Sequence, residues 1–157
     1  MPTWAAAQVN PAFSEITEAT EQARTLVQTE RKLVVSNNLG LSAVEGNAFW
    51  PLYDRYMSEL KSAGNLRVKV ITDYAASYDN MSDETARKLV DDSMKHHENV
   101  LKIRKNYLGK FRKVLPATKL ARFFQIENKL DAITNFALAR QIPLMQPAGQ
   151  PAAKPGS

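Results

Sequence analysis

The amino-acid sequence predicts an all-α fold of about four helices, two of them long, arranged as an elongated helical hairpin or cradle. Apolar residues recur every three to four positions along most of residues 11–143, which is the spacing of one helix face. β-Branched residues occur singly within this spacing, and no stretch alternates apolar and polar residues as a strand does. Capping residues also precede the apolar runs, which favours helices over loops.

The first expected helix covers about residues 14–35. Its apolar stripe consists of Ile16, Ala19, Ala23, Leu26, Val27, Leu33 and Val34. Asn37, Asn38 and Gly40 follow the stripe. We expect them to close the helix, because Asn and Gly tolerate the left-handed backbone that ends helices.

The second expected helix covers residues 42–77 and begins with a capping box. The Ser42 hydroxyl can accept from the N–H of Glu45, while the Glu45 carboxylate reaches back to the N–H of Ser42. Pro51 should bend this helix because proline lacks an N–H, and Gly64 marks a second weak point. We expect the aromatic residues of this segment to pack between helices: Trp50, Tyr53, Tyr56, Tyr74 and Tyr78.

The third expected helix covers residues 82–115, and Ser82 caps it. Its expected inner face holds Ala86, Leu89, Val90, Met94, His97, Leu101, Leu108, Phe111, Val114 and Leu115. Pro116 is expected at the first position of a fourth helix, which ends near Gln141 before Pro143. The inner face of that helix is expected to hold Leu120, Phe123, Phe124, Ile126, Leu130, Ile133 and Ala137.

These helices form one domain over residues 11–143, and residues 144–157 predict a flexible tail rich in Pro and Ala. Residues 1–10 predict a leader or a signal-peptide remnant, since 5–7 are three alanines like those before a cleavage site. A short leader of a cytosolic protein fits as well. No apolar run approaches the roughly 18–20 residues of a membrane span. The absence of Cys excludes disulfides and thiolate chemistry.

Positive charge is concentrated in one part of the chain. The formal net charge is +5, and no carboxylate lies between Glu98 and Glu127. The cations of this stretch, which we name the basic stretch, are Lys102, Arg104, Lys105, Lys110, Arg112, Lys113, Lys119 and Arg122. Aromatic residues lie among them: Tyr107, Phe111, Phe123 and Phe124. Such a mixture predicts a surface that binds acidic, partly unfolded polypeptide. Nucleic acid and a merely solvated helix face are the alternatives.

The sequence offers one weak candidate for a metal site and none for catalysis. Asp92, His96, His97 and Glu98 form the one cluster that could ligate metal, but one helix cannot supply the three or four ligands that zinc needs. We therefore keep a metal site as an alternative that needs a second helix or a partner subunit. No nucleophile, glycine-rich loop or triad is evident, so we expect neither enzyme activity nor a cofactor.

Two helix starts repeat each other. Leu41-Ser42 is followed by Phe49-Trp50, and Leu115-Pro116 is followed at the same offset by Phe123-Phe124. The segments Leu41-Ser42-x-x-Glu45 and Leu115-Pro116-x-x-Lys119 resemble the paired LTxxQ motifs of the Spy/CpxP-like proteins of the bacterial periplasm. The strings 49–53 (FWPLY) and 122–132 (RFFQIENKLDA) are similar to an uncharacterised proteobacterial branch of that family. Pro116 and Lys119 depart from the motif.

This resemblance implies an exported, often homodimeric, cradle-shaped protein with its signal peptide removed. Members of the family include ATP-independent chaperones that hold unfolded clients on a basic, partly apolar concave face. We therefore expect a periplasmic protein of the envelope stress response that binds unfolded or aggregation-prone proteins, with no role for nucleic acid. The alternatives are a periplasmic sensor or buffer for zinc, nickel, cobalt or copper, and an accessory subunit that binds a membrane-anchored signalling partner. A thin core also favours a homodimer.

Overall fold

The computed structural model describes residues 18, 22 and 29–146. Its helices are α2 (Ala43–Ser77), α3 (Asp83–Phe111) and α4 (Ala117–Gln141), with a 3₁₀ turn, η1 (Tyr78–Asn80), between α2 and α3. A helical segment over residues 29–39 precedes them and is here called the N-terminal segment. Every regular element of the described residues is helical, which confirms the predicted all-α fold.

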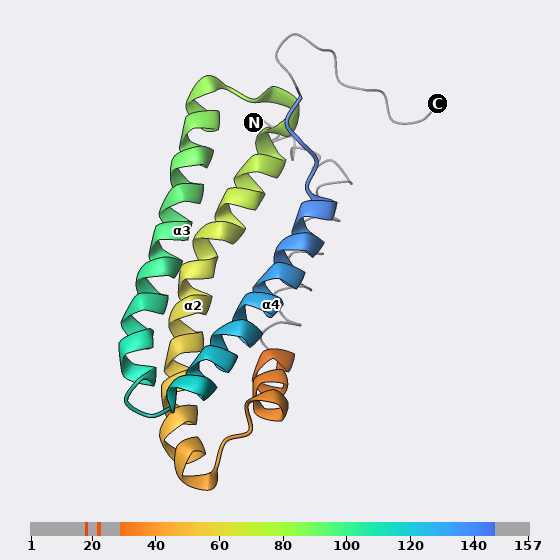
Figure 1. Ribbon diagram of the computed structural model, residues 1–157. Helices are drawn as coiled ribbons and strands as arrows, with labels where there is room; N and C mark the ends of the chain where they lie inside the picture. Colours follow the sequence, from red (N-terminus) through yellow and green to blue (C-terminus); the bar gives the residue numbers. More distant parts are fainter. Residues whose placement is uncertain (1–17, 19–21, 23–28, 147–157) are drawn as a thin grey trace, which may run out of the picture.

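The helices form an open, elongated bundle. Helices α2 and α3 run antiparallel along their length, while α4 starts beside the far end of α3 and returns along the other side of α2 (Figure 1). The N-terminal segment lies against the first half of α4 in the same view. α4 therefore forms one wall and the α2–α3 hairpin forms another.

The N-terminal segment ends at Leu39, four residues later than predicted. Gly40 ends it with a φ of +64°, the left-handed conformation that glycine adopts without steric cost. Asn38 does not terminate the helix, because its side chain donates to the Val34 carbonyl at 2.8 Å. The predicted inner face was also wrong here: Leu33 is exposed, whereas Val35 and Leu39 are buried. The predicted apolar positions from 16 to 27 lie outside the described residues.

Helix α2 begins as predicted. The Ser42 hydroxyl accepts from the Glu45 N–H at 3.2 Å, and the Ser42 N–H donates to the Glu45 carboxylate at 2.9 Å. The helix then continues without a break through Pro51 and Gly64. A proline removes only one backbone hydrogen bond, so the packing of the flanking aromatic residues can hold the helix together.

The core is aromatic and lies where the three long helices meet. The rings of Phe49, Phe111 and Phe123 pack with centroids 5.0–5.3 Å apart. Tyr53 and Tyr56 are buried beside them, which confirms their predicted packing role. Aromatic pairs at these separations add to the stabilisation that comes from burial alone. The buried aromatic residues thus gather at the end of the bundle where α2 begins, α3 ends and α4 begins.

Helices α3 and α4 differ from the predictions in their ends and faces. α3 ends at Phe111 instead of 115, and Pro116 is the N-cap of α4 instead of its first residue. The inner face of α3 carries Tyr107 and Phe111. His96 is buried on this face, whereas His97 is exposed. Successive helix positions differ by about 100°, so an error of one residue turns a side chain from the core toward solvent. Other predicted inner positions are exposed too: Val90, Met94, Leu101, Ile133 and Ala137.

Candidate functional site: a cationic groove between the helices

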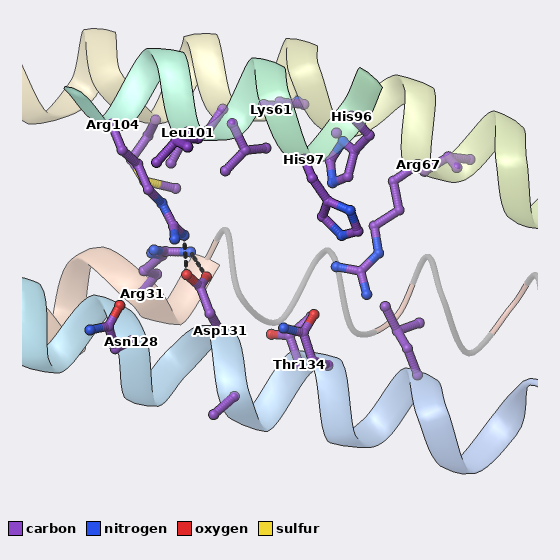
Figure 2. A pocket seen from close by; sticks show the side chains of 18 residues that line it. Arg31, Lys61, Arg67, His96, His97, Leu101, Arg104, Asn128, Asp131 and Thr134 are labelled. Carbon is purple, nitrogen blue, oxygen red and sulfur yellow. Dashed lines mark hydrogen bonds and ion pairs between the residues drawn. The ribbon is translucent and has the colours of Figure 1, made fainter. Parts of the chain in front are cut away.

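A groove lies between the α2–α3 hairpin and α4 (Figure 2). It encloses about 510 Å³, within the usual range of ligand sites. Side chains of α2, α3 and α4 line it, together with Arg31 from the N-terminal segment. Its apolar lining comprises Met57, Leu60, Val68, Val100, Leu101, Ala132 and Leu138.

The charged lining of the groove is strongly one-sided. Four Arg or Lys side chains line it, namely Arg31, Lys61, Arg67 and Arg104, and Asp131 is the single carboxylate among the lining residues that the structure describes. His96 and His97 also line it. The groove therefore carries a positive potential on apolar walls.

An ion-pair network closes one end of the groove. The Arg31 guanidinium donates to both carboxylate oxygens of Glu127, with an Nε–Oε1 distance of 2.9 Å. It also contacts Asp131 at 3.3 Å, and Arg104 donates to the other oxygen of Asp131. Burial lowers the pKa of Arg31, but the adjacent carboxylate of Glu127 outweighs this and holds the pKa above its ordinary value. Both cations of this network, Arg31 and Arg104, are therefore paired with carboxylates.

Tyr56 completes the network beneath the groove. Its hydroxyl donates to Glu127 at 3.3 Å. Burial, and then the negative charge of Glu127, raise the pKa of Tyr56 above its ordinary value. The hydroxyl therefore stays protonated and remains a donor at neutral pH.

Arg67 stands apart from this network. It is half-buried in the groove wall and makes no hydrogen bond or ion pair with any described residue. Burial lowers its pKa, and only the more distant charge of Asp131 opposes this. An arginine stays protonated even so, and no described residue forms an ion pair with its charge.

Within the predicted metal cluster, the rings of His96 and His97 are neighbours, with centroids 5.6 Å apart. The ring Nδ1 of His96 lies 3.1 Å from the Ala63 carbonyl, and Asp92 pairs with Lys88. His96 and His97 both line the groove. Over residues 18, 22 and 29–146, no three His, Cys, Asp or Glu side chains gather as a metal site would require.

The cations of the basic stretch divide into three groups. Three have structural partners: Arg104 pairs with Asp131, Lys119 with Glu45, and Arg122 donates to the Asn38 carbonyl. Lys110 lies 4.5 Å above the Tyr107 ring. The others are exposed on α3 and the turn that follows it: Lys102, Lys105, Arg112 and Lys113.

The aromatic residues predicted to share this surface lie elsewhere. Tyr107, Phe111 and Phe123 are buried in the core, so the expectation that they contact a client was wrong. They sit on the inner face because the bundle needs large apolar side chains where three helices meet. Phe124 is half-buried. The basic stretch therefore offers mainly charge, and the apolar component is found in the groove.

Sequence reasoning did not single out Arg31, Arg67, Glu127 or Asp131. One signal was present, since Glu127 falls at helical spacing between Leu120, Phe123 and Leu138, which are all buried. A carboxylate on an apolar stripe implies a buried cationic partner.

The chain matches no protein-family model, no curated protein and no solved structure. Within the described part of the chain, no helix is both long and apolar enough for a membrane crossing.

Proposed function

We propose that this protein holds unfolded or partly unfolded polypeptide without ATP, and that it does so in the bacterial periplasm as part of the envelope stress response. The observation that carries this proposal is the groove, which joins cationic and apolar side chains on one surface. The resemblance to the Spy/CpxP-like family is a second, independent support and concerns residues 31–144.

The exposed cations of the basic stretch and the apolar walls of the groove have separate roles in this proposal. The exposed cations of α3, such as Lys102 and Lys105, attract acidic chains over a distance and speed encounter. The apolar walls then retain the client by short-range contact. Leu101 is 52% exposed at the groove, and Met94 is 56% exposed seven residues earlier on the same helix. Exposed apolar side chains on a charged surface are typical of binding sites.

The proposal is tested by suppression of aggregation. A reduced or chemically denatured client should stay in solution when an equimolar amount of the protein is present at low salt. High salt should weaken the effect, because it screens the attraction. Absence of suppression at low salt would rule the proposal out.

A matched pair of variants ties the activity to the groove. Leu101→Gln removes an exposed apolar contact in the groove, and Val44→Gln removes one at the start of α2, outside it. We expect Leu101→Gln to weaken suppression several-fold and Val44→Gln to leave it unchanged. Equal activity of the two variants would show that clients bind elsewhere.

A homodimer and a removed signal peptide are part of the same proposal. Sedimentation at micromolar concentration should give twice the monomer mass. A monomer mass would refute the dimer. If the protein does not suppress aggregation at all but binds a membrane-anchored signalling protein, the accessory-subunit alternative is favoured.

A further inference from the structure

We infer that the groove contains an anion subsite centred on Arg67, which binds a carboxylate carried beside apolar groups. This inference rests on the proposed function and concerns which client segments the groove selects. The groove would favour client segments in which Asp or Glu lies next to large apolar residues.

The first argument is the balance of charge within the groove. Arg31 and Arg104 already share Asp131, and Arg31 also engages Glu127. Their positive charges are thus compensated. Arg67 lines the same cavity without a carboxylate, amide or hydroxyl partner among the described residues. A partly desolvated guanidinium gains by pairing with an anion, and no described residue fills this role at Arg67, so an incoming carboxylate can take it.

The second argument is the position of Arg67. Figure 2 shows its side chain extending from α2 toward α4, beside the His97 ring from α3 and away from the Asp131 network. Asn135 lines the cavity from α4, and its side-chain amide can donate a further hydrogen bond to a bound anion. The guanidinium presents a planar fork that matches a carboxylate in two-point contact.

The third argument is the surroundings of the Arg67 guanidinium. Val68, Leu101 and Leu138 line the same cavity. A ligand that reaches Arg67 therefore places its neighbouring groups against aliphatic side chains. A nucleic acid strand instead presents a row of phosphates, which matches a row of exposed cations better than one guanidinium among apolar walls. The chemistry favours an acidic and apolar polypeptide.

The test uses three fluorescent peptides of equal length and apolar content. One carries Glu and Asp between Leu and Phe, the second has Gln and Asn at those positions, and the third has Lys. Fluorescence anisotropy gives their affinities for the full chain and for Arg67→Gln, Arg67→Lys and Arg87→Gln. Arg87 is an exposed cation of α3 outside the groove, which makes it the matched control for net charge.

We expect the unmodified protein to prefer the acidic over the amide peptide by roughly tenfold, the size of one hydrogen-bonded charge contact. Arg67→Gln should reduce this ratio to between one and two, Arg67→Lys should keep part of it, and Arg87→Gln should keep nearly all of it. Thermal unfolding is the control for folding. Arg67→Gln should unfold at the original temperature or above, because it removes a partly buried charge that pairs with no described residue.

The outcomes separate the two proposals. If the peptides bind without a preference for acid, or if Arg67→Gln and Arg87→Gln lower the preference equally, the subsite is refuted and the proposed function stands. If no peptide binds while aggregation is still suppressed, the subsite is again refuted. If no peptide binds and no client is protected, both proposals fail.

Discussion

Replacement of Glu127 by glutamine should destabilise the fold severely, although it changes one atom of a side chain. Glu127 is 1% exposed and Arg31 is 5% exposed. Removal of one partner of a buried ion pair typically costs about 3–5 kcal/mol, since the other charge remains buried. Arg31 keeps its 3.3 Å contact with Asp131, so we place Glu127→Gln at the lower end, about 3 kcal/mol. For a chain of this length, that corresponds to a fall of about 6–12 °C in Tm.

Guanidinium unfolding followed by circular dichroism measures this loss directly. The control is Glu98→Gln, which neutralises an exposed carboxylate of α3 and should leave the midpoint unchanged. A double variant, Arg31→Met with Glu127→Leu, replaces both charges by apolar groups and should recover at least half of the loss. A single variant that loses less than about 1 kcal/mol would refute this account of the network, as would a double variant no more stable than Glu127→Gln.

Four further outcomes follow from the geometry. Phe123→Ala should cost about 3–5 kcal/mol in chemical denaturation, because it empties the centre of the aromatic core. Gly40→Ala should cost about 1 kcal/mol, since an alanine is strained at a φ of +64°, and Ser42→Ala should cost a similar ~1 kcal/mol through loss of the cap. Burial lowers the pKa of His96 in the folded state, so the unfolded chain takes up the proton more readily. Stability should therefore be full above about pH 6.5 and decline as the pH falls toward the folded pKa. His96→Gln should flatten this decline in unfolding curves at pH 7.5 and 5.5, and a His97→Gln variant that does the same would contradict the assignment.

Local signals predicted the helices well. The capping box at Ser42 and the cap at Ser82 join residues that are three positions apart in the sequence, and both occur as expected. Helix ends were less accurate where a helix meets the core. α3 stops at Phe111 because the chain must turn there to bring Leu115 and Leu120 back under the aromatic cluster. That requirement comes from the partner helix and is absent from the local sequence.

The faces of the helices were predicted less well than their existence. α3 carries apolar residues around a broad arc, so several phases fit its sequence about equally. The buried ring of Tyr107 selects one of them and places His96 against the Ala63 carbonyl. No pattern within α3 alone could distinguish His96 from its neighbour His97.

The candidate site was predicted only in its general chemistry. The sequence indicated cations beside apolar groups, and the groove combines both. It could not indicate which cations are already engaged, because Arg31 and Glu127 lie 96 residues apart. Arg67 is conspicuous only after Arg31 and Arg104 have been paired with their carboxylates. Compensation of charge is a property of the packed structure.

The same 96-residue separation bears on the order in which the chain folds. The α2–α3 hairpin depends on neighbouring segments, whereas the N-terminal segment must wait for α4 before Arg31 finds its carboxylates. Contacts between segments far apart in the sequence form late, because closing the long loop between them costs conformational entropy. We therefore expect Glu127→Gln to accelerate unfolding much more than it slows refolding in stopped-flow measurements. An equal effect on both rates would place this pairing in the folding nucleus. If the hairpin forms first, the groove is the last part of the molecule to be assembled and the first to open.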